Sequence, residues 1–391
     1  MKKLTILAFM SLSVFVVNAV ALPAFARQLG VSCSACHSQN GYPALNRFGR
    51  EFKASGYTMV GSQKVITDDK NSKFMSLTET LNMSLMANMS YSKSSSTSAT
   101  INVPNEASVF IGGRIAEGVG TFTEMGYDAE AASFSLVNMR LPFIYNISDY
   151  TVGVVPYLTD ADGPSASTNM LNAGSVVSSL GDLFAAQEYV QNGEVLAEGV
   201  SLYIYSDLWN AAYSAWIPVN GSASNVEFAN FASVAVTPRV GSWDVDVGAE
   251  IWWGTSQVQD PNNSSLVIRR KTDSYALKFQ ARGSISDVPV SFFGDYANAS
   301  SAVNSLYSVN TNDKYAASLS SEVAVLPRVV MVSAGYRLAD NGATTNSSDN
   351  GFLLGARYFY RENVQFRIGY MYLLDNTTDK HNIIASLDLA L

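Results

Sequence analysis

The sequence predicts an all-β fold, a transmembrane β-barrel of roughly sixteen antiparallel strands, preceded by a small α-helical segment. Three observations lead to this prediction. Short stretches of alternating apolar and polar residues recur from about residue 74 to the end of the chain. Tight turns such as "YRENV" alternate with longer polar loops such as "ADNGATTNSSDNG". Both cysteines lie in one short motif near the amino terminus, ahead of the alternating region.

The first residues are typical of an export signal. Two lysines precede an apolar stretch that ends near Leu22, and the tripeptide AFA at 24–26 has the small-x-small pattern of a cleavage site. We therefore expect a signal peptide over residues 1–26 and a mature chain that begins at Arg27 outside the cytoplasm. The alternative is a retained membrane anchor, because the apolar stretch is long enough to span a bilayer.

The motif "CSACH" predicts a covalent cofactor. In an exported chain a cysteine pair forms either a disulfide or a haem attachment site. The histidine directly after the second cysteine favours one c-type haem, with Cys33 and Cys36 bonded to the vinyl groups and His37 as the proximal iron ligand. A plain disulfide is the alternative.

A short helix is expected after the motif, between Pro43 and Gly56, because proline suits the first helical position and glycine the residue past the end. Leu45, Phe48 and Phe52 recur at helical spacing along it. The basic residues on its other side face solvent or pair with haem propionates or barrel acids. Residues 27–73 thus form a monohaem c-type cytochrome segment.

The second axial ligand is open at this stage. Met59, just past the expected helix, is the candidate distal ligand, and Met75 and Lys53 are substitutes. The other interpretation of Met59 is a filler of a small core. His381, the only histidine besides His37, lies beside a polar loop near the last strand, where a loop or interface role is expected.

The alternation in residues 74–391 indicates a porin-like barrel with a wet lumen rather than a soluble sandwich. In "VQFRIGYMYLL" and "SWDVDVGAEIWWG" one face is apolar and the other carries charge. The acids on the inward parity are Glu124, Asp128, Asp244, Asp246, Glu250, Asp295 and Glu322. Aromatic residues expected in interfacial girdles are Tyr358, Tyr360, Tyr370, Tyr372, Trp209 and Trp216. A long loop with a short helix near "GDLFAAQEYV" is expected within residues 159–198.

Charge divides the chain in the same way. Residues 27–73 hold seven basic and three acidic residues, net +4. The whole chain has 25 basic and 33 acidic residues, and two lysines lie in the leader, so residues 74–391 keep 16 basic and 30 acidic residues, net −14. A basic segment beside an acidic barrel favours placement in or against the lumen, whose acids would concentrate cations. Nothing in the sequence indicates nucleic-acid binding.

The stretches "ARQLGVSCSACH" and "PALNRFGREFKASGYTM", followed by such a barrel, resemble the fused outer-membrane cytochrome–porins of iron-oxidising bacteria. The local match spans about residues 26–59, and the match over the barrel is architectural. The resemblance implies one haem in or at the mouth of a sixteen-stranded porin in the bacterial outer membrane, with Cys33, Cys36 and His37 as haem-binding residues. It also implies oxidation of extracellular Fe(II) and transfer of electrons to a soluble periplasmic cytochrome or similar carrier.

The sequence therefore favours an Fe(II):cytochrome c oxidoreductase of the outer membrane, working by outer-sphere transfer to the haem. A conduit for another extracellular donor or acceptor is the second hypothesis. A passive diffusion porin with a haem plug is the third. No catalytic residues beyond the haem are expected, because cysteine and histidine are nearly absent elsewhere.

Overall fold

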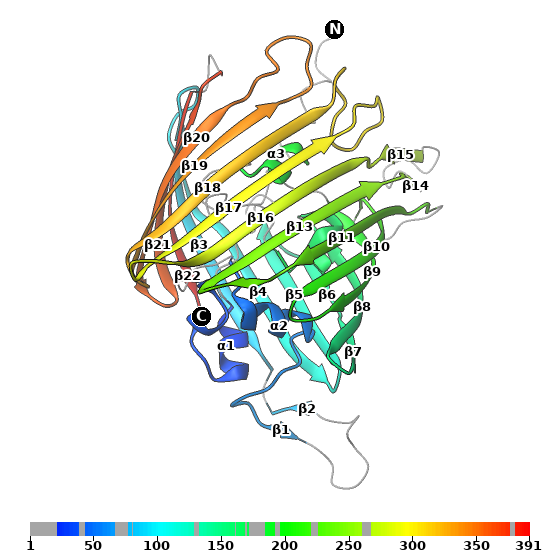
Figure 1. Cartoon of the computed structure of the whole chain (residues 1–391), viewed down its shortest axis with the longest axis vertical. Coiled ribbons are helices and arrows are strands. Elements are labelled where there is room, and N and C mark those ends of the chain that lie inside the picture. Colours follow the sequence, from blue (N-terminus) through cyan, green and yellow to red (C-terminus); the bar gives the residue numbers. More distant parts are fainter. Residues whose placement is uncertain are drawn as a thin grey trace.

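The structure, a computed structural model of the whole chain, describes most of the sequence. The described residues are 22–38, 44–66, 77–79, 81–128, 133–160, 162–168, 170–171, 184–191, 196–219, 226–259, 267–375 and 380–391. Their architecture is one closed β-barrel with helical segments at one mouth and inside the lumen (Figure 1). The expected leader lies almost wholly outside the described residues.

The barrel has sixteen antiparallel strands, as the alternation predicts. Eighteen strand segments form the ring, and it closes where β22 pairs with β3. Segments β6 and β7 both pair with β5 and with β8, so they complete one strand between them. Segments β11 and β12 likewise pair with β13 one after the other. Counting each of these two pairs as one strand gives sixteen.

The barrel strands are β3 (Met83–Ser94), β4 (Thr100–Ala116), β5 (Val119–Asp128), β6 (Ser133–Arg140), β7 (Phe143–Ile147), β8 (Tyr150–Thr159), β9 (Ala197–Tyr205), β10 (Trp209–Ile217), β11 (Ala229–Val236), β12 (Arg239–Val240), β13 (Trp243–Trp253), β16 (Ser274–Ile285), β17 (Val288–Ala299), β18 (Lys314–Leu326), β19 (Val330–Asp340), β20 (Gly351–Arg361), β21 (Val364–Leu373) and β22 (His381–Ala390). Outside the ring lie two short hairpins, β1 (Val65–Ile66) with β2 (Leu77–Thr78) and β14 (Thr255–Gln259) with β15 (Val267–Lys271).

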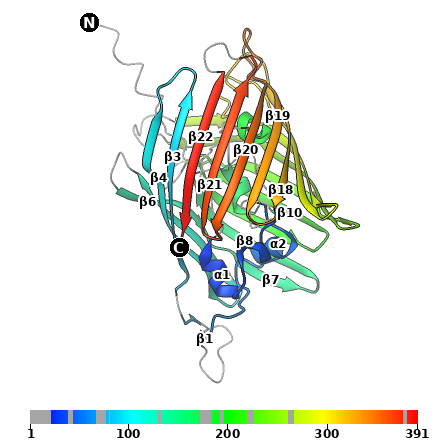
Figure 2. The ribbon, with the colours of Figure 1, turned by 90° about the vertical axis from the view of Figure 1, so that its left-hand side faces the viewer.

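The two ends of the barrel differ in the length of their connections. At one end, strands are joined by turns of two or three residues, such as 117–118, 286–287 and 362–363. At the other end, longer loops such as 300–313 and 341–350 connect them. Figure 2 shows the carboxyl terminus and helix α1 (Pro23–Leu29) at the short-turn end. In outer-membrane barrels short turns face the periplasm, which places both at the periplasmic mouth.

The outer surface of the barrel is apolar, as expected for a lipid-facing wall. On β21, Phe366 and Ile368 are exposed while Gln365 and Arg367 between them are buried in the lumen. The same alternation holds on β13 and β16. Among the girdle residues, the prediction for Trp216 is wrong: its side chain is fully buried inside the barrel. Its parity on β10 is that of inward-facing Ser214, so the indole fills the lumen.

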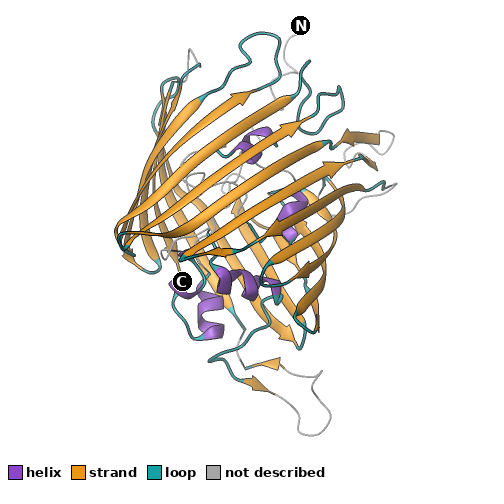
Figure 3. Cartoon of the chain, in the orientation of Figure 1, coloured by secondary structure: helices purple, strands orange, loops and turns teal. Residues whose placement is uncertain are grey.

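The segment between β8 and β9 enters the lumen instead of remaining outside. Its described parts include the 3-10 helix η3 (Gly163–Ser167) and the helix α3 (Ala186–Val190), both almost completely buried (Figure 3). This confirms the expected short helix. Helix α3 packs on β17 and β18 at a row of small residues. The row consists of cross-strand partners Ala276, Ala297, Ala316 and Ala339, which leave the space that the helix occupies.

Two polar contacts hold α3 in place. The backbone N–H of Gln187 donates to Asp295 Oδ2 at 2.9 Å. The ring of Tyr189 lies between Lys314 and Arg337, at 4.7 and 4.3 Å from the cationic groups. Both basic residues stand on barrel strands, so the inserted segment is fastened to the wall at both ends of the helix.

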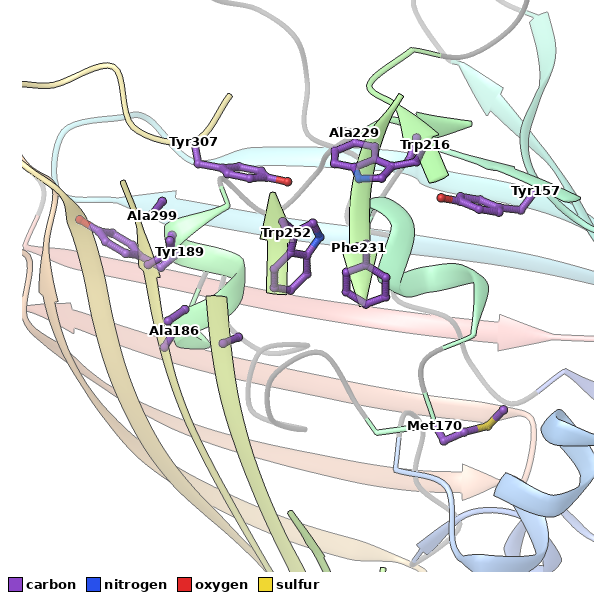
Figure 4. Close-up of a cluster of buried hydrophobic side chains, with 14 of the residues drawn as sticks. Tyr157, Met170, Ala186, Tyr189, Trp216, Ala229, Phe231, Trp252, Ala299 and Tyr307 are labelled. Carbon is purple, nitrogen blue, oxygen red and sulfur yellow. The ribbon is translucent and has the colours of Figure 1, made fainter. Parts of the chain in front are cut away.

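A large apolar cluster surrounds this insertion, which differs from the expected wet lumen. Figure 4 shows Trp216, Phe231 and Trp252 on the wall with Tyr157 and Tyr307 around them. The rings of Phe231 and Trp252 are 5.0 Å apart. Buried charged residues line other parts of the lumen, among them Lys314 and Arg337 beside α3. The alternation does specify an inward face, but the inserted segment turns part of that face into a core.

No helix in the described ranges is long and apolar enough to cross a membrane.

Candidate functional site

The amino-terminal residues 22–38 and 44–66, called the plug below, lie across the periplasmic mouth of the barrel (Figure 1). They contain α1, the 3-10 helix η1 (Cys33–Ala35) and the helix α2 (Arg47–Ala54). The expected helix is therefore present but shorter than predicted. Asn46 caps it by accepting a hydrogen bond from the N–H of Gly49 at 3.0 Å, and Gly56, at φ +63°, follows its end. Pro43 lies outside the described residues.

Ion pairs join α2 to the inner wall of the barrel. The guanidinium of Arg50 is 3.3 Å from Asp246 on β13, and both side chains are buried. Asp246 also pairs with Arg282 on β16. At the rim, Arg47 bonds to Asp207 at 2.5 Å, in an exposed position. Two basic residues of α2, Arg47 and Arg50, therefore meet acids of the barrel, one of the two kinds of partner that the sequence predicted.

An aromatic stack seats the other side of the plug. The ring of Phe25 lies parallel to Tyr57 at 4.9 Å and edge-on to Phe52 at 5.2 Å. Phe122 on β5 is 6.3 Å from Phe25. Ala24 is fully buried, and its N–H donates to Ser84 Oγ on β3 at 2.7 Å. Residues on the amino-terminal side of the predicted cleavage site at Ala26 thus form part of the packed plug.

Gln28 connects the plug to strand β4 and to Asn82, the residue directly before β3. Its buried Nε2 donates to the carbonyls of Tyr57 at 2.7 Å and Met59 at 2.6 Å. Its Oε1 accepts from Asn82 Nδ2 at 2.6 Å and from the N–H of Arg114 at 3.1 Å. One buried amide therefore makes four hydrogen bonds that tie α1, the end of the plug and the wall together.

The C-x-x-C-H motif forms a tight turn against α2. The N–H of His37 donates to the carbonyl of Cys33 at 3.0 Å, which brings the residues of the motif close together. Asn46 holds the turn from the other side: its Nδ2 donates to Ala35 O and its N–H to Cys36 O, both at 2.9 Å. A side chain at Gly49 would collide with that Cys36 carbonyl. Glycine at this position lets the motif lie directly on the helix.

The electrostatics of the motif suit a neutral donor set. Both thiols are free and half-buried. Burial raises the pKa of Cys36 to about 11, with a further contribution from Cys33, and burial followed by the charge of Glu362 raises the pKa of Cys33. Raised pKa values disfavour the thiolate, so the pair lacks the character of a redox-active dithiol. Burial lowers the pKa of His37 to about 4, which keeps the imidazole neutral and able to bind a metal.

These residues fit a covalently attached haem. Two free thiols and a neutral imidazole on one turn are the donor set that c-type attachment requires. Cys33 and Cys36 would hold the macrocycle and His37 the iron. The motif lies beside the short turn that carries Glu362, at the periplasmic end of the barrel. The haem itself stays a prediction.

The candidate axial ligands on the distal side are spread over the molecule. Met59 belongs to the plug through the bond of its carbonyl to Gln28, while the role of its thioether stays a prediction. Met75 lies outside the described residues. His381 is the first residue of β22, and the other end of this strand packs on Leu22 of the plug. The length of the strand, about ten residues or roughly 30 Å, therefore separates His381 from the plug. The Nδ1 of His381 is 2.6 Å from the Tyr370 hydroxyl, and its loop or interface role stays a prediction.

Most of the inward-facing acids are paired. Asp246 pairs with Arg50 and Arg282, Glu250 with Lys278 at 2.7 Å, and Glu322 with Arg357. Asp388, whose place on the inward parity the sequence interpretation missed, pairs with Arg367 at 2.6 Å. Its alternation with Leu387 and Leu389 was the signal that could have found it. Cross-strand pairing of opposite charges stabilises the wall.

The comparisons with known proteins concern the barrel. No protein-family model matches the sequence, and no characterised protein matches it in sequence. Solved structures do match in shape. OmpT of Vibrio cholerae aligns at TM-score 0.52 and 12% identity, over 84% of this chain and 100% of that one. DcaP, an outer-membrane channel of Acinetobacter baumannii, aligns at 0.51 and 11%, over 80% and 97%. OmpF of Salmonella typhi, solved with daunomycin, aligns at 0.51 and 10%, over 84% and 100%.

The chain has the outer-membrane porin fold. Sixteen strands, short turns at one end, an inserted loop and an apolar outer wall agree with that fold. An exposed apolar wall around a polar interior is stable only in lipid, so the porin barrel lies in a bacterial outer membrane. The likeness to solved porins shows the fold of the barrel alone. It says nothing of the plug.

Proposed function

We propose that the protein is an outer-membrane electron conduit that oxidises extracellular Fe(II) and passes the electrons to a soluble periplasmic cytochrome or similar carrier. The observation that carries the proposal is a C-x-x-C-H turn with free thiols, held in a plug at the periplasmic mouth of a porin barrel. A c-type haem bound there would supply one-electron redox chemistry. Cys33 and Cys36 would attach it, and His37 would hold the iron.

The placement of the plug supports a transmembrane relay. A bilayer's hydrocarbon core is about 30 Å thick and blocks electron flow between donor and acceptor on opposite sides. A redox group in the plug meets periplasmic carriers at the short-turn end and faces the lumen on its other side. The buried Arg50–Asp246 pair and the Gln28 contacts hold the plug in that position.

Excess acid in the barrel supports a cationic substrate. Residues 74–391 carry a net charge of −14, which raises the local concentration of cations such as Fe(II). Met59 is the proposed distal ligand. Its thioether would raise the reduction potential relative to a second histidine.

Stopped-flow spectroscopy tests the proposal. Full-length protein, produced in a host with haem-maturation machinery and oxidised, is mixed with Fe(II). Rapid growth of the reduced c-haem α-band is expected, and Cys33→Ala/Cys36→Ala should carry no covalent haem. A haem that dithionite reduces and Fe(II) does not would refute iron oxidation and favour a conduit for another donor or acceptor. Met59→Ala should lower the midpoint potential, and an unchanged potential would refute the ligand assignment.

The porin fold favours one alternative of a different class, a passive diffusion channel whose plug is structural. Planar-bilayer recordings separate the two. A relay with a seated plug should pass little current, because the plug and the inserted segment with α3 obstruct the lumen. A steady porin-like conductance in the full-length protein would favour passive diffusion.

A further inference from the structure

Glu124 on β5 is an inward-facing acid that has no ion-pair partner among the side chains that the structure describes. Its side chain is 1% exposed, and no well-aligned hydrogen bond reaches either carboxylate oxygen, although the Ser108 hydroxyl lies near them. Phe122, two residues away on the same face, packs against Phe25 of the plug. Glu124 thus lies on the lumen side of the plug. Removing a carboxylate from water without a partner costs several kcal/mol, so such a group in a native protein calls for a partner such as an ion or water.

The neighbours of Glu124 offer mostly oxygen atoms, and the donor nearest its carboxylate is the neutral hydroxyl of Ser108 on β4. Asn138 is its direct cross-strand partner on β6. The Nδ2 of Asn138 is turned toward Thr159 Oγ1 on β8, at 3.4 Å, and its buried Oδ1 has no hydrogen-bond partner. Asp160, next to Thr159, also has a buried Oδ1 without a partner. Glu124 on β5, Asn138 on β6 and Asp160 directly after β8 therefore supply oxygens without a well-aligned partner from neighbouring parts of the wall.

The surrounding charges compensate for these oxygens only in part. Arg140, two residues beyond Asn138, stacks over the ring of Phe122 at 4.8 Å, and no ion pair joins it to Glu124 within the described ranges. On β4, the carboxylate of Glu106 accepts from Asn88 Nδ2 at 3.0 Å and adds a further negative charge. The patch therefore combines several acceptors with excess negative charge, and a cation is the ligand that satisfies both.

We propose that Glu124, Asn138 and Asp160 bind a partly hydrated divalent cation on the lumen wall above the plug. Carboxylate and amide oxygens are the ligands that hard cations such as Mg²⁺, Ca²⁺ and Mn²⁺ prefer, and Fe(II) also accepts them. No three His, Cys, Asp or Glu side chains in the described part of the chain lie close enough to chelate one ion. Water must therefore complete the shell, as it does for Mg²⁺.

The site goes beyond the proposed function and does not depend on a haem. In a passive porin it would hold a cation in the lumen. In an electron conduit it would hold the cationic substrate on the lumen side of the plug. Its failure and the failure of the iron-oxidase proposal are therefore separable, because metal binding is measured without turnover.

Mn²⁺ is the probe, because its free EPR signal disappears when it binds. Full-length protein in detergent is titrated with Mn²⁺, with and without haem. One saturable site is expected in both forms. Glu124→Gln should weaken it at least tenfold, and Asn138→Ala and Asp160→Asn should each weaken it severalfold. The matched control is Glu117→Gln, because Glu117 is exposed in the turn between β4 and β5. It should bind as the wild type does.

Two results would overturn the assignment. One is saturable binding that Glu124→Gln leaves unchanged, which would place the ion elsewhere. The other is no saturable binding in wild-type protein whose heat-modifiable gel mobility shows a folded barrel, which would mean that Glu124 is satisfied without a cation. Equal weakening by Glu124→Gln and Glu117→Gln would indicate diffuse attraction and would also refute a built site.

Discussion

Replacing Asp246 by asparagine is the sharpest perturbation of the plug. Asp246 is fully buried between two guanidinium groups, Arg50 of α2 and Arg282 of β16. Without its charge the two cations face each other in a water-poor site. Two unit charges about 4 Å apart interact by roughly 4 kcal/mol at an effective dielectric constant of 20. Breaking a buried pair by removing one partner costs about 3–5 kcal/mol. We expect the free energy of plug opening to fall by about 3 kcal/mol.

Amide hydrogen exchange of α2, followed by mass spectrometry in detergent, measures that opening. A change of about 3 kcal/mol corresponds to exchange roughly 150-fold faster. The matched control is Asp207→Asn, which removes the partner of Arg47 on the same helix. Those side chains are 33% and 60% exposed, so the loss should stay below about 1 kcal/mol, under roughly fivefold.

A second variant tests the cause. In Arg50→Met/Asp246→Asn the repulsion between the two guanidinium groups is gone, so the double variant should exchange no faster than Asp246→Asn alone. The reasoning is refuted if Asp246→Asn and Asp207→Asn have equal effects while the barrel keeps its folded gel mobility. Strictly additive effects of the two substitutions at 50 and 246 would refute it as well.

Three further predictions follow from the plug and the lumen. Gly49→Ala should lower covalent haem incorporation severalfold, because the new Cβ collides with the motif turn. The control Gly294→Ala should not lower it, because the atoms nearest to its new Cβ are 3.7 Å away. Equal haem incorporation in the two variants would contradict the packing of the motif on α2. Ala297→Leu should displace α3 from the row of alanines and raise the single-channel conductance. Ala334→Leu, on the lipid face, should leave the conductance unchanged. Unaltered currents in both variants would argue against packing of α3 on the alanine row. Burial, with a smaller contribution from the charge of Arg140, lowers the pKa of Lys53 to about 7 from the ordinary lysine value of 10.5. Between these two pH values the unfolded chain binds more protons at Lys53 than the folded protein does. The free energy of unfolding should therefore rise with pH across that window. Thermal melts of wild type and Lys53→Met should diverge there, and parallel curves would count against a buried Lys53.

The barrel was predictable because its pattern is local. Lipid-facing and lumen-facing residues alternate along each strand, so stretches such as 364–373 reveal their outward face without knowledge of the neighbouring strands. The count of sixteen follows from the same stretches and from the turn residues between them. The motif at 33–37 was equally local, because its chemistry depends only on the spacing of three side chains.

The lumen was not predictable in this way. The parity of Trp216 along β10 identifies the face on which it lies. An aromatic residue near a strand end suits both an interfacial girdle and a packed core. Trp216 belongs to the core because the inserted segment with α3 fills the lumen beside it. Local sequence gives no signal that Ala276, Ala297, Ala316 and Ala339 stand in one row, because register between strands fixes that row.

The sequence by itself determined the sixteen-strand barrel, the segregation of charge and the C-x-x-C-H turn, because each depends on residues a few positions apart. Only the tertiary structure decided how the plug is seated, which acids remain unpaired and what fills the lumen. Arg50 and Asp246 are 196 residues apart in the chain and meet because the barrel closes around the plug. Partners inside a closed barrel are set by strand register and loop insertion, and these come from packing of the whole chain.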